Sequence, residues 1–201
     1  MFLKTKGYFV SNYYHLKSRY ALRGSKKIII GSSGIFQDGW FSTDLPEIDI
    51  TSIDQCSRFW KKESKTAFFA EHVWEHLDQE DAIKGAQCCY YFLKNKGRIR
   101  VAVPDGNHPD ESYIEYVRPG GTGAGADDHK SLFTVDTLTA IFQNAGFRVR
   151  PLEYWDSNGV FQKEGWQTKW GKVARSVNND ERNTLEKPYC YTSIIIDCHK
   201  D

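Results

Sequence analysis

One short segment carries two histidines and a glutamate at a spacing that can bind a metal ion. His72-Val73-Trp74-Glu75-His76 satisfies the pattern H-x-x-E-H, which in inverted zincins places the ligands on one helical face around zinc. However, the apolar stretch 66–70 predicts a strand that runs straight into the pattern, and Asp78 is typical of a helix start just after it. The five residues would then straddle a loop. We therefore expect no bound metal, and a zinc metallopeptidase remains an alternative.

A second candidate site follows a short β-branched run near the start of the chain. Ile28-Ile29-Ile30 leads into Gly31-Ser32-Ser33-Gly34, as a buried strand does when it feeds a turn. Such a turn lets backbone N–H groups approach a ligand, and an acidic side chain beyond it can accept hydrogen bonds from ribose hydroxyls. Asp44 is the first candidate for that acid, and Asp49 and Asp54 are alternatives, because Asp44 follows Gly34 more closely than the dinucleotide pattern expects.

Alternating helix and strand periods predict an α/β domain around these residues. Strands are expected at 26–31, 40–45, 66–70, 98–103, 147–154 and 191–198. Asp78 should cap a helix that continues to a stop at Gly97, and Thr134 should cap a second helix that stops at Gly146. The remaining parts are a helical extension at 1–25, a glycine-rich lid-like loop at 106–130 and a polar insertion at 156–190.

Composition restricts the class of partner. The 201 residues fit one domain, and 27 basic against 26 acidic residues give a net charge of +1. No strong field would draw such a chain to nucleic acid or to an anionic membrane, and no segment is apolar enough to span one. The five cysteines form no C-x-x-C pair, which suits a reducing compartment. We therefore expect a cytoplasmic protein with a small or neutral partner.

Three stretches in order resemble the class I S-adenosylmethionine-dependent methyltransferases, over roughly residues 26–200. The run from Ile28 to Gly34, followed by Gly39-Trp40 and Asp44, is similar to the cofactor loop and second strand of a compact subgroup. The stretch 70–77 resembles the signature "H-V-L-E-H-L", and the stretch 93–105 resembles "L-K-P-G-G-R-L-R-I-A-V-P-D". The order and spacing of the last two are the specific part of the likeness.

The resemblance implies a fold, a cofactor and a set of site residues. The fold would be Rossmann-like and doubly wound, with a mostly parallel sheet of about seven strands and an antiparallel edge hairpin. The cofactor would be S-adenosylmethionine, with S-adenosylhomocysteine as product. The residues expected to bind it are Gly31, Ser32, Ser33, Gly34 and Asp44, followed by Asp54, Glu71 and His72.

The sulfonium methyl group of the cofactor is already activated, so methyl transfer needs mainly an aligned acceptor, and a base only where the acceptor must lose a proton. His129, between Asp127-Asp128 and the helix at Thr134, is the first candidate base, and His72 is the second. Glu75 and His76 are expected to orient the loop. By resemblance, the acceptor would be a small molecule or a glycan sugar, with no nucleic acid or membrane partner, and a homodimer is left open. The loop departs from the three-glycine pattern, so a catalytically degenerate cofactor-binding or regulatory protein is the alternative.

Overall fold

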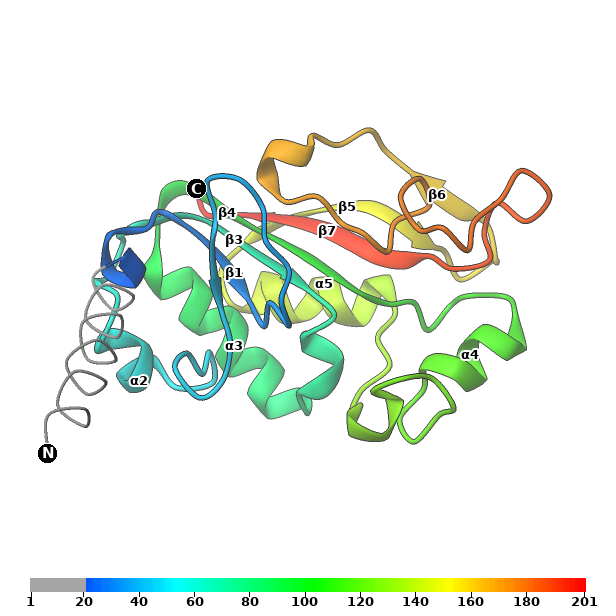
Figure 1. Cartoon of the computed structure of the whole chain (residues 1–201), viewed down its shortest axis with the longest axis horizontal. Helices are drawn as coiled ribbons and strands as arrows, with labels where there is room; N and C mark the ends of the chain where they lie inside the picture. Colours follow the sequence, from blue (N-terminus) through cyan, green and yellow to red (C-terminus); the bar gives the residue numbers. More distant parts are fainter. Residues whose placement is uncertain (1–20) are drawn as a thin grey trace, which may run out of the picture.

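A central mixed sheet organises residues 21–201, the part of the chain that this computed structural model describes. The strand order is β2-β1-β3-β4-β7-β5-β6 (Figure 1). The strands are β1 (Lys27–Ile30), β2 (Phe41–Thr43), β3 (Lys65–Glu71), β4 (Leu93–Pro104), β5 (Arg148–Trp155), β6 (Phe161–Lys163) and β7 (Ser193–His199). The helices are α2 (Ile53–Ser57), α3 (Gln79–Phe92), α4 (Glu111–Val117) and α5 (Val135–Asn144), with short 3₁₀ turns η1 (Trp74–His76), η2 (Ala126–Asp128) and η3 (Thr168–Trp170). Most of the extension expected at 1–25 lies outside the described residues.

Strand direction confirms the expected α/β fold class. β1 pairs in parallel with β2 and β3, and β3 pairs in parallel with β4. β7 lies antiparallel between β4 and β5, and β6 pairs antiparallel with β5 at the edge. The edge hairpin is therefore β5–β6. β7 occupies an inner position in the sheet, and all of its residues except His199 are buried there.

The two main helices begin where their capping residues predict. The Asp78 carboxylate accepts a hydrogen bond from the Asp81 amide at 2.9 Å at the start of α3. Thr134 begins α5 with a reciprocal capping box to Thr137. The predicted stop of the first helix at Gly97 is wrong, because α3 ends at Phe92. Leu93 is fully buried and pairs with Lys65 in the sheet, so burial in the sheet overrides the helical spacing there.

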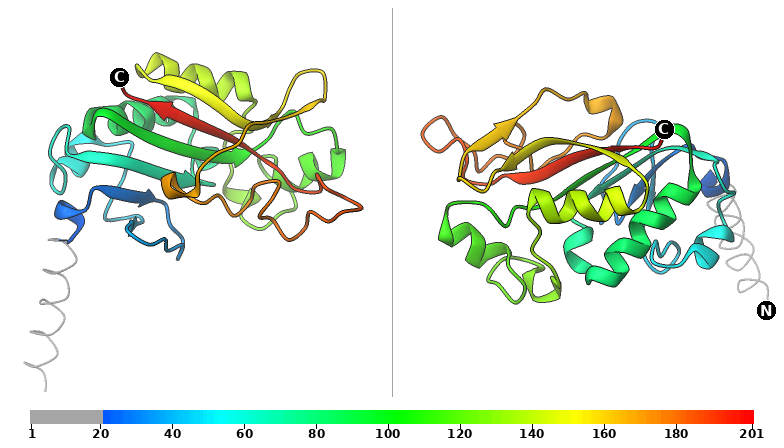
Figure 2. Two further views of the ribbon diagram at one scale, coloured as in Figure 1. Left: turned by 90° about the horizontal axis from the view of Figure 1, so that it is seen from above. Right: turned by 180° about the vertical axis from the view of Figure 1, so that it is seen from behind.

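Helices cover one face of the sheet, and an irregular segment covers the other. α3 and α5 pack on the first face, and residues 156–190, which contain only β6 and η3, lie over the second (Figures 1 and 2). Arg100 fixes this segment: it donates to both carboxylate oxygens of Asp197 at 2.7 and 2.8 Å, and to the carbonyls of Gln167 and Gly171 at 3.0 and 2.8 Å. The polar insertion thus takes the place of a helical layer of the doubly wound plan.

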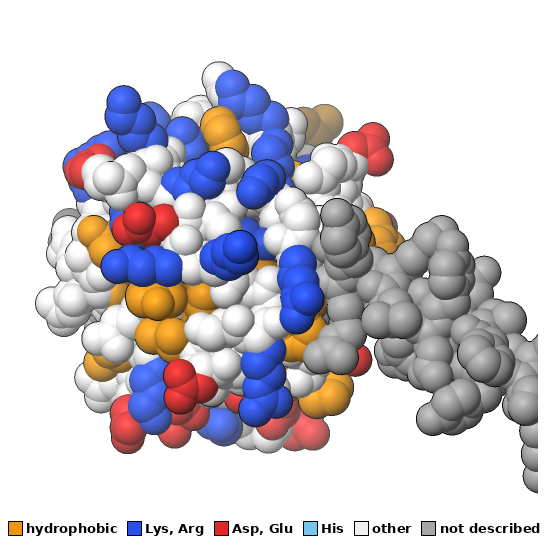
Figure 3. Space-filling model, turned by 90° about the vertical axis from the view of Figure 1, so that its left-hand side faces the viewer, with side chains coloured by type: hydrophobic (Ala, Val, Ile, Leu, Met, Phe, Trp, Pro, Cys, Tyr) orange, Lys and Arg blue, Asp and Glu red, His pale blue; other side chains and the backbone are white. Residues whose placement is uncertain are grey.

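The glycine-rich region 106–130 is partly helical, because it contains α4 and η2 (Figure 1). Its role as a lid stays a prediction. No helix among residues 21–201 is both long and apolar enough to cross a membrane. On the face at the amino ends of the parallel strands, Lys and Arg side chains are more numerous than Asp and Glu, and several lie next to one another (Figure 3).

Candidate functional site

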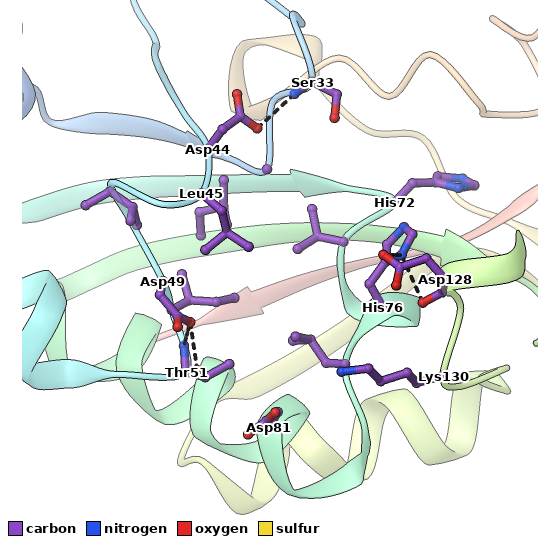
Figure 4. A pocket seen from close by; sticks show the side chains of 16 residues that line it. Ser33, Asp44, Leu45, Asp49, Thr51, His72, His76, Asp81, Asp128 and Lys130 are labelled. Carbon is purple, nitrogen blue, oxygen red and sulfur yellow. Dashed lines mark hydrogen bonds and ion pairs between the residues drawn. The ribbon is translucent and has the colours of Figure 1, made fainter. Parts of the chain in front are cut away.

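A pocket of about 600 Å³ lies at the carboxyl ends of β1, β2 and β3. Ligands of open α/β sheets bind at this edge. Its wall combines the turn after β1, the segment after β2, the turn after β3 and the start of α3 (Figure 4). The lining residues are Ile30, Gly31, Ser33, Asp44, Leu45, Ile48, Asp49, Ile50, Thr51, His72, Val73, His76, Leu77, Asp81, Asp128 and Lys130.

The turn after β1 needs glycine at its first position. Gly31 has φ +59°, and a Cβ atom there would lie 2.6 Å from Cγ2 of Val73. The backbone of the turn therefore approaches the turn after β3 more closely than a side chain would allow.

Asp44 lies directly after β2 and faces this turn. Its carboxylate accepts a hydrogen bond from the Ser32 hydroxyl at 2.6 Å. It accepts a second from the Ser33 amide at 3.0 Å (Figure 4). Ser32 is buried, whereas Ser33 and Asp44 line the pocket. The acid is thus already held beside the glycine turn, with hydroxyl and amide donors that a ligand can replace.

The structure gathers most of the expected cofactor residues but not all. Gly31, Ser33, Asp44 and His72 line the pocket, Ser32 supports Asp44, and Gly34 lies exposed in the same turn.

Two of the expected cofactor residues lie elsewhere. Asp54 is exposed in the first turn of α2 and borders a separate hollow with Lys84 and Gln87. Glu71 is buried, and its carboxylate accepts hydrogen bonds from the amides of Ala174 and Arg175 at 3.1 and 2.7 Å. The structure therefore places neither residue on the pocket: α2 carries Asp54 away from the turn, and Glu71 anchors the insertion 156–190. Among the alternatives, Asp49 lines the pocket.

His72 and Glu75 form a pair at the inner end of the pocket. His72 has a left-handed backbone, φ +56°, and its amide donates to the Ala102 carbonyl at 2.8 Å. Its Nδ1 lies 2.9 Å from Oε1 of Glu75, and its Nε2 lies 3.3 Å from the Ser193 hydroxyl. Burial alone raises the pKa of Glu75, but the adjacent His72, through its charge, holds that pKa below its ordinary value. Glu75 therefore stays ionised beside Nδ1 of His72.

His129, the first candidate base, is held behind the pocket wall. Its Nδ1 lies 2.7 Å from the Val117 carbonyl, and it is not among the pocket-lining residues. Its ring meets that of His76 edge to face, with centroids 4.8 Å apart. The structure therefore gives His72 the better position for contact with an acceptor.

The H-x-x-E-H segment does not form the helix that an inverted zincin needs. β3 ends at Glu71, η1 is a single 3₁₀ turn, and α3 begins only at Gln79. This confirms the expected loop. The fold instead brings His129 to Glu75 and His76, a grouping that the spacing within the segment does not reveal.

Comparisons with known proteins identify the fold. No family profile and no curated protein matches the sequence. Among solved structures, the chain is similar to an S-adenosylmethionine-dependent methyltransferase from Archaeoglobus fulgidus, with 18% identity, a TM-score of 0.51, and 92% of this chain and 93% of that one covered. The chain has the fold of the class I S-adenosylmethionine-dependent methyltransferases.

Two further structures support the methyltransferase fold over nearly the full length. One is a methyltransferase from Thermotoga maritima, described as a possible histamine N-methyltransferase, at 14% identity and TM-score 0.51, with 98% of this chain and 94% of that one covered. The other was solved in a complex with a Haloferax volcanii methyltransferase activator, at 10% identity and TM-score 0.51, with 91% and 88% covered. At these identities the likeness carries the fold, and the site must carry the function.

Proposed function

We propose that this protein is an S-adenosylmethionine-dependent methyltransferase whose acceptor is a small molecule or a sugar. The observation that carries the proposal is the joint position of the Gly31 turn and Asp44 at the carboxyl ends of β1 and β2, on a pocket of about 600 Å³. A volume of this order suits a small ligand. The fold suggests S-adenosylmethionine as the cofactor, and the Gly31 turn and Asp44 provide groups that can bind it.

The donor and acceptor groups of the pocket suit that cofactor. A side chain at position 31 would clash with Val73, so the turn has room only for backbone there. The backbone of Gly31 lines the pocket, where backbone groups can approach a ligand closely. Asp44 accepts hydrogen bonds from Ser32 and Ser33 without a ligand, and ribose hydroxyls are the same kind of donor. We assign the ribose to Asp44 for this reason.

When bound, S-adenosylmethionine supplies an activated methyl group. His72 lines the pocket with Nδ1 2.9 Å from the ionised Glu75, so we assign the ring proton to Nδ1. Nε2, which lies 3.3 Å from the Ser193 hydroxyl, would then accept a proton from an acceptor hydroxyl or amine that takes the place of Ser193. A fixed tautomer removes the need to reorient the ring during the reaction. Asp49, Asp81, Asp128 and Lys130 make the remaining wall polar and charged, which favours an acceptor with several hydrogen-bonding groups, such as a sugar.

Calorimetric titration with S-adenosylmethionine and, separately, S-adenosylhomocysteine tests the proposal. We expect one-to-one binding that Asp44→Ala weakens by about tenfold to a hundredfold, the effect of losing 1.5–3 kcal/mol of hydrogen bonds to a charged group. Asp54→Ala is the matched control and should bind like the wild type, since Asp54 lies outside the pocket.

The outcomes separate the alternatives. If neither compound binds, or if Asp54→Ala weakens binding as much as Asp44→Ala, the assignment is wrong. Binding without formation of S-adenosylhomocysteine across a panel of hydroxyl and amine acceptors would favour a catalytically degenerate binding protein. Turnover that His72→Asn removes while cofactor affinity is kept would support the role of His72.

A further inference from the structure

A cluster of potential metal ligands lies beside the pocket. Glu75, His76 and His129 each offer one ligand atom, and these atoms all lie within 4.8 Å of one another. Glu75 and His76 belong to η1, and His129 follows η2. The two segments are fixed together, because the amides of Lys130 and Ser131 donate to the Glu75 carbonyl at 2.8 and 3.0 Å. Backbone hydrogen bonds therefore hold together the two segments that carry the three side chains.

In both histidines, Nδ1 faces an oxygen acceptor, which leaves Nε2 available to bind a metal ion. His129 Nδ1 lies 2.7 Å from the Val117 carbonyl, which can only accept, so Nδ1 carries the proton and Nε2 keeps its lone pair. His76 Nδ1 lies 3.3 Å from both the backbone carbonyl and the carboxylate of Asp128 (Figure 4). Histidines that bind metals are commonly oriented by such an acceptor on the second nitrogen.

Glu75 supplies an unsatisfied carboxylate oxygen. The side chain is fully buried, and His72 pairs with Oε1. Within residues 21–201, neither Oε1 nor Oε2 accepts a hydrogen bond, although Nδ1 of His72 lies 2.9 Å from Oε1. A buried carboxylate oxygen without a partner is costly, and a cation next to it would remove that cost.

We propose that Glu75, His76 and His129 bind a divalent transition-metal ion of the zinc or manganese class. Two imidazoles and one carboxylate are a donor set for such ions, and three protein ligands leave a coordination position open. Ligand atoms about 2.0 Å from a tetrahedral zinc lie about 3.3 Å apart. Closing the set from within 4.8 Å needs only side-chain movement.

This site differs from the one that H-x-x-E-H suggests. His72 is directed to Glu75 and Ser193, and His129 takes its place in the ligand set. The two sites share Glu75, whose carboxylate lies beside His72 and offers one oxygen to the metal.

If the protein is a methyltransferase, as proposed above, a metal ion in this cluster would also restrict the chemical class of the methyl acceptor. His76 and Asp128 line the same pocket as Gly31 and Asp44, so the open position would face the acceptor. A metal ion there would bind an acceptor oxygen and lower the pKa of its hydroxyl group. The structure thus favours hydroxyl compounds as acceptors over amines.

Metal titration of the full-length protein, stripped with EDTA and dialysed, tests the site without any methyl transfer. We use Zn²⁺ and Mn²⁺ in calorimetry and Co²⁺ in absorption spectroscopy. The parent carries Cys190→Ser, because Cys190 is the exposed cysteine. We expect one ion per chain, and a loss of affinity of about a hundredfold in Glu75→Gln, His76→Ala and His129→Ala, since second-shell changes alone cost up to that much. His199→Ala is the control and should bind normally, because His199 pairs with Arg98 at the opposite end of β4.

Three results decide between the readings. Absence of binding by all three ions, or equal affinity in the parent and the three ligand variants, overturns the site. A ligand variant that does not fold in EDTA is replaced by its conservative form, His76→Gln or His129→Gln, and the same comparison applies. Titration with S-adenosylmethionine in EDTA separates the two proposals: metal binding without cofactor binding supports the metal site and rejects the proposed function.

Discussion

Gly31 is the position where a single methyl group should test the geometry of the site. Alanine there must keep a left-handed backbone, which costs roughly 1–2 kcal/mol, and its Cβ would lie 2.6 Å from Cγ2 of Val73. Overpacking of this kind adds roughly 1–3 kcal/mol. We therefore expect Gly31→Ala to lower the free energy of unfolding by roughly 2–5 kcal/mol. The turn should also move away from the pocket and weaken S-adenosylmethionine binding.

The same turn offers a matched control. Gly34 has φ +88° and no atom within 4 Å of an added Cβ. Gly34→Ala therefore measures the left-handed cost without the clash, roughly 1–2 kcal/mol. Urea unfolding followed by tryptophan fluorescence gives both free energies.

A third variant identifies the clashing atoms. Val73→Ala removes both methyl groups that lie nearest the added Cβ. In that background, the cost of Gly31→Ala should fall to that of Gly34→Ala. Equal costs for Gly31→Ala and Gly34→Ala in the wild-type background, or an unchanged cost in the Val73→Ala background, would refute the close approach of the two turns.

Two further predictions concern buried charges. Burial raises the pKa of Asp105 to about 6. The folded protein therefore binds this proton more tightly than the unfolded chain does, and protonation adds about 3 kcal/mol to the free energy of unfolding. This contribution is complete below about pH 4 and is lost as the pH rises through about 6. Urea unfolding at several pH values should show this component in the wild type and not in Asp105→Asn; parallel curves would contradict it. Arg100→Met should cost about 3–5 kcal/mol by leaving Asp197 buried and unpaired. Most of that loss should return in Arg100→Met/Asp197→Leu, and a cost under about 1 kcal/mol would reject the anchoring role.

Local signals predicted the elements well because they act through neighbouring residues. Asp78 and Thr134 start their helices as expected, since a capping bond joins residues three positions apart. The predicted end of α3 is wrong, because Leu93 begins β4, which pairs with β3 at Lys65, a residue that precedes the whole helix in the chain. Periodicity cannot weigh such a distant pairing.

The same division applies to the site. The β-branched run, the glycine turn and Asp44 lie close in sequence, so their chemistry and order could be read directly, and the structure places them on one pocket. Asp54 and Glu71 rank behind Asp44 as candidate acids, but the sequence alone does not exclude either of them from the site. Only the path of α2 and the contacts of residues 174–175 exclude them from the pocket.

Six of the seven strands, the two capped helices and the methyltransferase-like motifs follow from the sequence alone, because each depends on residue type at short spacing, whereas β6, α2 and α4 are not predicted. Only the tertiary structure decided which acids face the pocket, that an irregular insertion covers the second face of the sheet, and that His129 joins Glu75 and His76. These features depend on contacts between segments that are distant in the chain. Burial and hydrogen bonding fix such contacts once the sheet has formed.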